Sequence, residues 1–167
     1  LQIKGRLHQY HQFSNRFNLG YTAETVISSK NLMNNYTSSV LQAPAFTPTP
    51  HSEIVFNEAF RANQYAAVGL SPIIKLSKLV HFRADLYCFA PFYEIKKDVI
   101  STGSTYIDSP YYGNFLRSFQ FMGEPSLVIS LPFASISLYA NGYSYPKQNF
   151  NFGLNIGYLI FNPKMLD

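Results

Sequence analysis

The sequence predicts an all-β protein, an antiparallel up-and-down β-barrel that spans a membrane, with about eight strands in this chain. Charged residues make up only 13% of the chain and hydrophobic residues 47%, whereas a soluble domain has about 25% charged residues. Aromatic residues reach 17%, which suits the aromatic girdles of a membrane barrel. No run of about 18 apolar residues occurs, so a spanning protein with this sequence has to be a barrel.

Long segments of alternating hydrophobicity carry this prediction. In segment 149–160 every even position is apolar, while the odd positions hold Asn or Gly up to Gly157. The alternation predicts a strand with one dry face and one wet face. Its length exceeds the mean of about 5–6 residues for soluble strands and fits the roughly 9–11 residues of a tilted membrane strand.

Further strands follow from the same pattern. The clearest are segments 1–12, 16–28, 81–90 and 134–145. Weaker patterns predict strands at 65–76, 113–122 and 125–131, and a short one near 53–60. Pro72 lies inside segment 65–76 and predicts an edge position, a bulge or a broken strand there, because proline cannot donate a ladder hydrogen bond.

The connections alternate between short and long, as in outer-membrane barrels. Tight turns are predicted at Ser14-Asn15, Ser77-Lys78 and Pro132-Phe133. Long loops near 29–52 and 94–112 are expected to face the outside, because the first is rich in Asn, Ser, Thr and Pro and the second contains Lys96, Lys97, Gly103 and Pro110. No change in composition suggests a second domain, so we expect residues 1–167 to form one barrel domain or a portion of one.

The sequence carries no catalytic, cofactor or metal signature. It lacks a G-x-S-x-G nucleophile motif and a glycine-rich phosphate-binding motif, and its four histidines do not have metal-ligand spacing. Cys88 is the only cysteine, so a thiolate metal cluster is excluded. The net charge of +4 is scattered, which argues against nucleic-acid binding. We expect no catalysis and no cofactor in this chain.

One group of polar residues stands out. Arg83 and Asp85 share a strand face that we expect to point into the barrel, where Glu24, Arg61 and Arg117 are candidate partners in a polar network. Ordinary wetted charges and a role in selectivity both fit this pattern. Arg117 shares its phase with Phe115 and phenylalanines beyond it, so either the face assignment fails there or the arginine reaches to an interface. The candidate interface aromatics are Tyr143, Tyr145, Tyr158 and Phe161.

Four segments together resemble a known family. Residues 82–87 (FRADLY), 123–128 (GEPSLV), the Pro132-Phe133 pair and the ending 151–161 are similar to the C-terminal surface-antigen barrel of Bacteroidetes patatin-like phospholipases. The resemblance covers most of 53–167 and implies a barrel of about sixteen strands, of which this chain supplies roughly the C-terminal half. Segment 151–161 also resembles the terminal strand by which barrel-assembly machinery recognises its substrates.

The resemblance has limits that matter for function. The patatin nucleophile and its aspartate belong to a domain that is not in this chain, so the resemblance assigns a catalytic role in hydrolysis to no residue here. The lid-loop motif of related assembly barrels, Val-Arg-Gly-Tyr, has its nearest match in Phe60-Arg61-Ala62, which lacks the glycine. Because Leu1 begins directly on a strand pattern, we expect the N-terminus to be processed or truncated.

The expected function is an outer-membrane barrel segment that anchors, and helps to translocate, a patatin-like lipid acyl hydrolase domain. Its expected partners are the lipid bilayer, the N-terminal patatin and barrel portions of the parent chain, and the assembly machinery. Two alternatives stay open at this point: a complete eight-stranded outer-membrane barrel, and a soluble up-and-down barrel that binds an apolar ligand.

Overall fold

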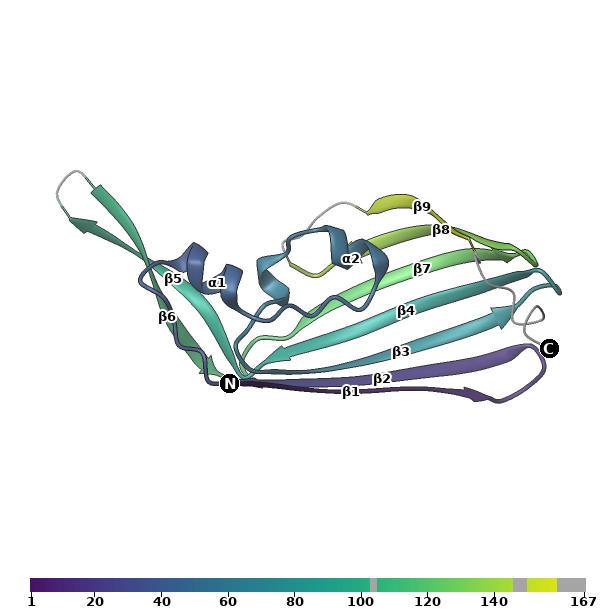
Figure 1. Cartoon of the computed structure of the whole chain (residues 1–167), viewed down its shortest axis with the longest axis horizontal. Coiled ribbons are helices and arrows are strands. Elements are labelled where there is room, and N and C mark those ends of the chain that lie inside the picture. Colours follow the sequence, from purple (N-terminus) through teal and green to yellow (C-terminus); the bar gives the residue numbers. More distant parts are fainter. Residues whose placement is uncertain (103–104, 146–149, 159–167) are drawn as a thin grey trace.

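The computed structural model describes residues 1–102, 105–145 and 150–158. The prediction of an all-β, antiparallel fold is confirmed, since strands dominate and the helices are short. Seven strands form one sheet, in the order β1-β2-β3-β4-β7-β8-β9 (Figure 1). They are β1 (Gln2–Gln12), β2 (Phe17–Ser28), β3 (Tyr65–Lys75), β4 (Val80–Pro91), β7 (Gln120–Ser130), β8 (Ala134–Tyr143) and β9 (Asn151–Tyr158).

The sheet has a short-turn end and a long-connection end. Turns at 13–16, 76–79 and 131–133 lie together at the right of Figure 1, as predicted. The hydroxyls of Ser14 and Ser77 each accept hydrogen bonds from two backbone N–H groups within their turns, which closes both turns locally. The connections β2–β3, β4–β7 and β8–β9 lie at the opposite end.

Three predicted segments differ in the structure. Residues 94–112 were expected to be a loop but belong to a hairpin of β5 (Tyr93–Thr102) and β6 (Thr105–Phe115), which extends away from the sheet (Figure 1). The predicted strand 113–122 is wrong, because β6 ends at Phe115 and Leu116 has a φ of 49°, which turns the chain before β7 begins. The predicted strand near 53–60 is also wrong, since that segment is mainly helical.

Pro72 belongs to β3, which is paired on both sides, so of the three predicted alternatives the edge position is wrong. Strand β3 pairs with β4 at Leu70–Leu86 and again at Ile73–Arg83, in one unchanged register. The two rungs between them are missing, and no bulge shifts the strands. The proline therefore interrupts the ladder on its β4 side, where it has no N–H to donate.

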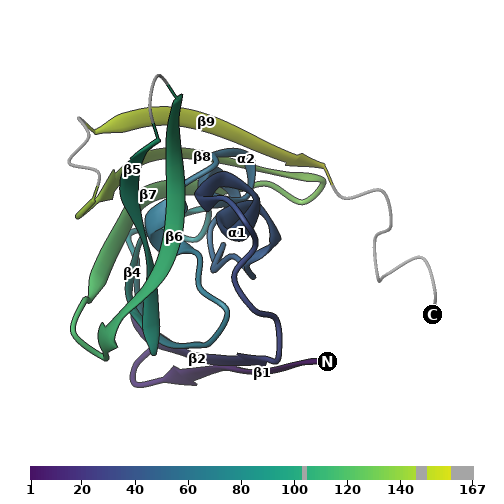
Figure 2. The ribbon, with the colours of Figure 1, turned by 90° about the vertical axis from the view of Figure 1, so that its left-hand side faces the viewer.

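The inserted segment, residues 29–64 between β2 and β3, lies against one face of the sheet, which curls around it (Figure 2). It contains α1 (Tyr36–Gln42), α2 (Pro50–Ile54) and a 3₁₀ turn at Glu58–Phe60. Side-chain caps begin each element: Asn35 caps α1, Thr49 forms a capping box with Ser52, and Asn57 caps the 3₁₀ turn. These local hydrogen bonds explain why this segment is helical.

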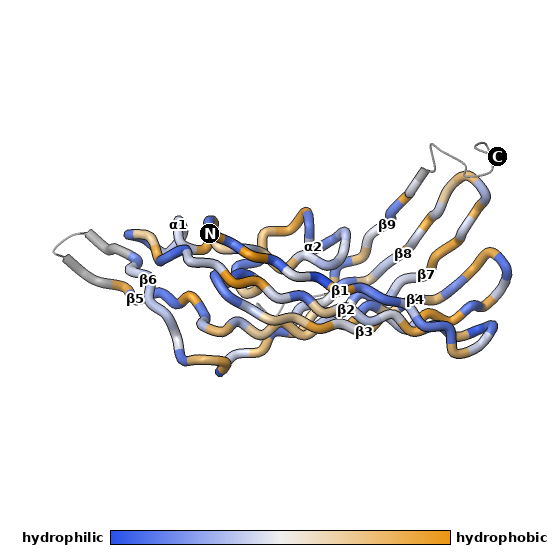
Figure 3. Tube along the Cα trace, turned by 60° about the horizontal axis from the view of Figure 1, so that its bottom comes forward, coloured by the Kyte–Doolittle hydropathy of each residue, from blue (hydrophilic) through white to orange (hydrophobic). Residues whose placement is uncertain are grey.

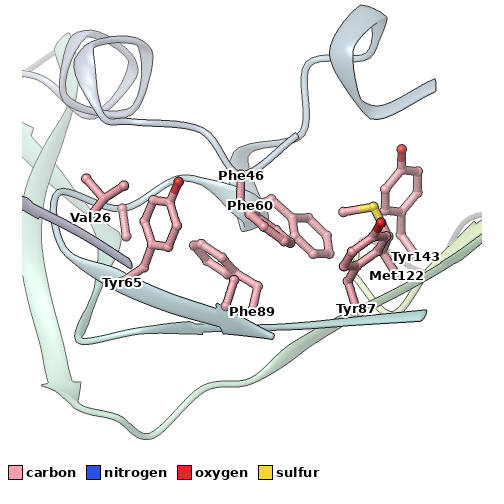
Figure 4. Packing of buried hydrophobic residues seen from close by; sticks show 10 residues of the cluster. Val26, Phe46, Phe60, Tyr65, Tyr87, Phe89, Met122 and Tyr143 are labelled. Carbon is pink, nitrogen blue, oxygen red and sulfur yellow. The ribbon is translucent and has the colours of Figure 1, made fainter. Parts of the chain in front are cut away.

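The main hydrophobic core lies between the inserted segment and the long-connection half of the sheet (Figure 4). Phe46 stacks on Phe89, with ring centroids 5.9 Å apart, and contacts Tyr65 and Tyr87 edge-on. Phe60, which also belongs to the inserted segment, packs against Phe89. The segment therefore supplies side chains that the fold buries, in addition to joining two strands.

Three tyrosines lie over glycines of the neighbouring strand, on the face that the inserted segment covers. The cross-strand pairs are Tyr10 with Gly20, Tyr87 with Gly69, and Tyr139 with Gly153. A Cβ at any of these glycines would overlap the tyrosine ring. The rings therefore lie flat across the strands, a packing device that fixes register in curved sheets.

Candidate functional site

The two faces of the sheet differ sharply in chemistry. Alternation along each strand, combined with the register between strands, assigns every residue to one face or the other, and the alternation is visible in the hydropathy colouring of Figure 3. We call the face toward the inserted segment the polar face and the opposite one the apolar face. All the charged residues of the seven strands lie on the polar face: Lys4, Arg6, Glu24, Lys75, Arg83, Asp85 and Glu124.

The apolar face is the exposed one. In the described strands of the sheet it carries no Asp, Glu, Lys or Arg side chain. Large aliphatic and aromatic residues stand open on every strand, among them Leu7, Ile27, Val68, Leu86, Phe121, Leu138 and Leu154. An apolar depression of about 1020 Å³ crosses five strands of this face around Cys88, Phe121 and Gly123. This distribution inverts the usual pattern of a water-soluble protein.

Glu24 is the centre of the first polar cluster. Its carboxylate is 2.8 Å from Lys4 Nζ and 3.7 Å from Arg6 Nε, and it accepts a hydrogen bond of 2.7 Å from the Tyr65 hydroxyl. Tyr65 also donates to the Ala45 carbonyl at 3.3 Å, which ties the cluster to the inserted segment. The carboxylate is buried, and these partners are what makes a buried charge tolerable.

The second cluster surrounds Asp85. Arg83 Nε lies 2.7 Å from one carboxylate oxygen and donates to the other at 2.9 Å, and the Ser71 hydroxyl also donates to Asp85. The predicted Arg83–Asp85 pair is therefore present. Directly opposite Asp85, on β7, lies the buried Glu124, which accepts a hydrogen bond of 3.0 Å from Asn141 Nδ2.

Arg61 and Arg117, the other two predicted members of the polar network, lie outside both clusters. Arg61 lies in the inserted segment, where its guanidinium donates to three carbonyls at the end of α1 and stands 4.7 Å from the centroid of the Phe56 ring. Burial lowers the pKa of Arg61. Arg117 is an exposed residue of the β6–β7 connection. The strand break at Leu116 removes the phase conflict, because Phe115 and Arg117 are not in one strand.

The predicted interface aromatics are only partly placed as expected. Tyr143 is buried on the polar face, where it shares a hydrogen bond of 2.9 Å with His51 Nδ1 of α2. The alternating pattern of β8 extends to Tyr143, which packs in the core beneath α2. Tyr145 is 58% exposed at the long-connection end. Tyr158 ends β9, and Phe161 lies outside the described residues.

An aromatic cluster that the sequence did not single out marks the base of the β5–β6 hairpin. Tyr93 lies between Tyr112 and Phe115, with ring centroids 6.0 and 5.4 Å away, and Phe92 contacts Phe115. The Tyr112 hydroxyl accepts a hydrogen bond of 2.7 Å from Asn63, which joins the hairpin to the inserted segment. Of these four aromatic residues only Tyr112 lies within the predicted loop 94–112, and the other three flank it.

Neither metal chemistry nor a helical membrane span is found in the described residues. No group of three or more His, Cys, Asp or Glu side chains there is arranged to hold a metal ion. None of the helices in the described part of the chain has the length and apolar character needed to cross a membrane. Comparisons with family models, with curated proteins and with solved structures find no match for this chain.

Proposed function

We propose that the seven-stranded sheet is part of the wall of a bacterial outer-membrane β-barrel, with its apolar face toward lipid and its polar face toward the barrel interior. One observation carries the proposal: every charged residue of these strands lies on the polar face, while the large residues that stand exposed on the opposite face are apolar. A soluble domain would show the opposite arrangement, because its apolar residues are buried from water.

The dimensions of the strands support the same conclusion. Six of the seven strands have 10 to 12 residues, and a tilted strand needs about 9–11 residues to cross the hydrocarbon core. The tight turns gather at one end and the long connections at the other, which matches periplasmic turns and outer loops. The inserted segment then lies inside the barrel at its outer end.

The direction of curvature argues against the soluble barrel. In that alternative the apolar side chains would line the interior and bind the ligand. The sheet instead curls around the inserted segment with its polar face inward (Figure 2), and the apolar depression near Cys88 opens on the outer side. An apolar ligand inside the curve would meet Glu24, Asp85 and Glu124.

The family resemblance extends the proposal to the parent protein. In this extension the barrel anchors a periplasmic patatin-like lipid acyl hydrolase and helps to translocate it, after insertion by the assembly machinery. The resemblance alone supports this part. No residue described here takes a catalytic role in it.

Cys88 provides the experiment. It lies on the apolar face in the second half of β4, opposite Val68 and Phe121. In the full-length protein in bilayers, we expect labelling by a lipid-soluble maleimide and not by a charged, impermeant one. Two variants in a Cys88→Ser background calibrate the assay: Leu138→Cys, 58% exposed on the same face, and Asn15→Cys in a short turn.

The two variants distinguish a lipid environment from an aqueous one. We expect Leu138→Cys to behave like Cys88, while Asn15→Cys reacts with the charged reagent. Leu138 is open enough that burial within the protein cannot account for poor labelling. Fast reaction of both apolar-face cysteines with the charged reagent would disprove the lipid contact.

A further inference from the structure

Strand β1 is an edge strand of the sheet, and the topology of the sheet limits what can pair with its outer edge. Each of the six neighbouring pairs in the sheet is antiparallel. Six reversals of direction leave the two edge strands, β1 and β9, running the same way. Direct closure of β1 on β9 would therefore make a parallel pair, whereas bacterial outer-membrane barrels are antiparallel with an even number of strands.

A second copy does not solve the problem. Copies inserted in the same orientation are related by rotation about the barrel axis, which preserves strand direction. The β9 strand of one copy would again meet β1 of the next in parallel. Only an odd number of additional strands between β9 and β1 gives an antiparallel closed wall.

The backbone of β1 has a row of N–H and C=O groups that do not bond to β2. Ser29 N–H donates to the Leu1 carbonyl, and Phe13 N–H donates to the Phe17 carbonyl. Odd-numbered residues of β1 therefore bond to β2, and even-numbered residues point their N–H and C=O groups away from the sheet. In hydrocarbon these groups need partners, because no water is present to satisfy them.

The side chains of β1 indicate the chemistry of the partner. Lys4 and Arg6 both stand on the polar face and share the single carboxylate of Glu24. Their side chains are 45% and 46% exposed. On the apolar face Ile3 and Leu7 stand open. A fitting strand carries an acidic residue toward the barrel interior and apolar residues toward lipid.

We propose that β1 pairs antiparallel with a strand of the same barrel that comes from a segment outside residues 1–167. This strand is one of an odd number of additional strands, and it carries an acidic residue opposite Lys4 or Arg6. This inference rests on the proposed function. Its test is separate, because lipid contact at Cys88 reports on the apolar face and says nothing about the edge.

Amide hydrogen exchange in the full-length protein in bilayers tests the pairing. The amides of Ile3, Gly5 and Leu7 bond to β2 and serve as the internal standard. We expect the amides of Arg6 and His8 to exchange as slowly as the standard. Exchange at least about a hundredfold faster than the standard would overturn the proposal, since it would show a free edge.

A pair of substitutions gives an independent test. His8→Pro removes only an edge-facing N–H, and His8→Ala is its control, because both lose the contact of His8 Nδ1 with the Thr22 hydroxyl at 3.2 Å. We expect His8→Pro to reduce the heat-modifiable folded fraction at least tenfold relative to His8→Ala. Equal folded fractions would contradict a paired edge, because proline is tolerated at unpaired edges.

The mass of the folded particle in detergent identifies the source of the strand. A particle with one copy of the chain is expected. A particle with two copies, together with slow exchange at Arg6 and His8, would overturn the assignment to the same chain.

Discussion

Leu138 offers the most direct energetic test of the proposal that the apolar face contacts lipid. It lies in the middle of β8 on the apolar face, between Leu127 of β7 and Leu154 of β9. Its side chain is 58% exposed, so in water an arginine there would change stability by no more than about 0.5 kcal/mol. At the centre of a bilayer the same substitution costs about 2–4 kcal/mol, which is roughly a 30- to 700-fold loss in the folding equilibrium constant.

The neighbouring residue is the matched control. Ser137 belongs to the same strand but to the polar face, opposite Val128 and Asn155. Equilibrium unfolding of the full-length protein in lipid bilayers, followed by the heat-modifiable band, gives both free energies. We expect Leu138→Arg to lower the free energy of unfolding by at least 2 kcal/mol more than Ser137→Arg does. An equal or reversed ranking would refute the assignment of the two faces.

The remaining predictions concern packing, and each is read from the free energy of unfolding. Gly69→Ala should destabilise by about 1–3 kcal/mol, because the new Cβ overlaps the Tyr87 ring, while Gly5→Ala, whose nearest neighbour atom would be 3.6 Å away, should have little effect. Phe46→Ala should cost about 3–5 kcal/mol, since it opens a cavity between the inserted segment and the sheet. Glu24→Gln should cost about 1–2 kcal/mol, less than a fully buried pair, because its two cationic partners are nearly half exposed.

The strands could be predicted because the two sides of the sheet have different surroundings. Where both faces keep their character along the whole strand, as in 16–28 and 81–90, the alternation gives the strand within one or two residues. The alternating pattern fails to predict the strand where a local backbone feature interrupts it. The positive φ of Leu116 splits 113–122, and the caps at Thr49 and Asn57 override the pattern in 53–60.

The polar network was only half visible for a similar reason. Arg83 and Asp85 are two residues apart on one strand, so alternation alone puts them together. Glu124 was missed because it precedes the predicted strand 125–131, although β7 begins at Gln120. Arg61 was assigned to the network by its charge, but its position depends on the tertiary path of the inserted segment, which no local pattern encodes.

In the proposed barrel, the position of the core determines how firmly the inserted segment is held at the long-connection end. Phe46 and Phe60 of the inserted segment are 2% and 3% exposed, and they supply the rings that pack on Tyr65, Phe89 and Tyr143. Withdrawing the segment would lose the burial of both rings, at about 3–5 kcal/mol each by the measure of a Phe→Ala change. Even the lower sum, about 6 kcal/mol, leaves an open form at roughly one part in 25,000. In the proposed barrel, passage through this end would therefore require a partner that binds the open form more tightly by a comparable free energy, because thermal opening alone is too rare.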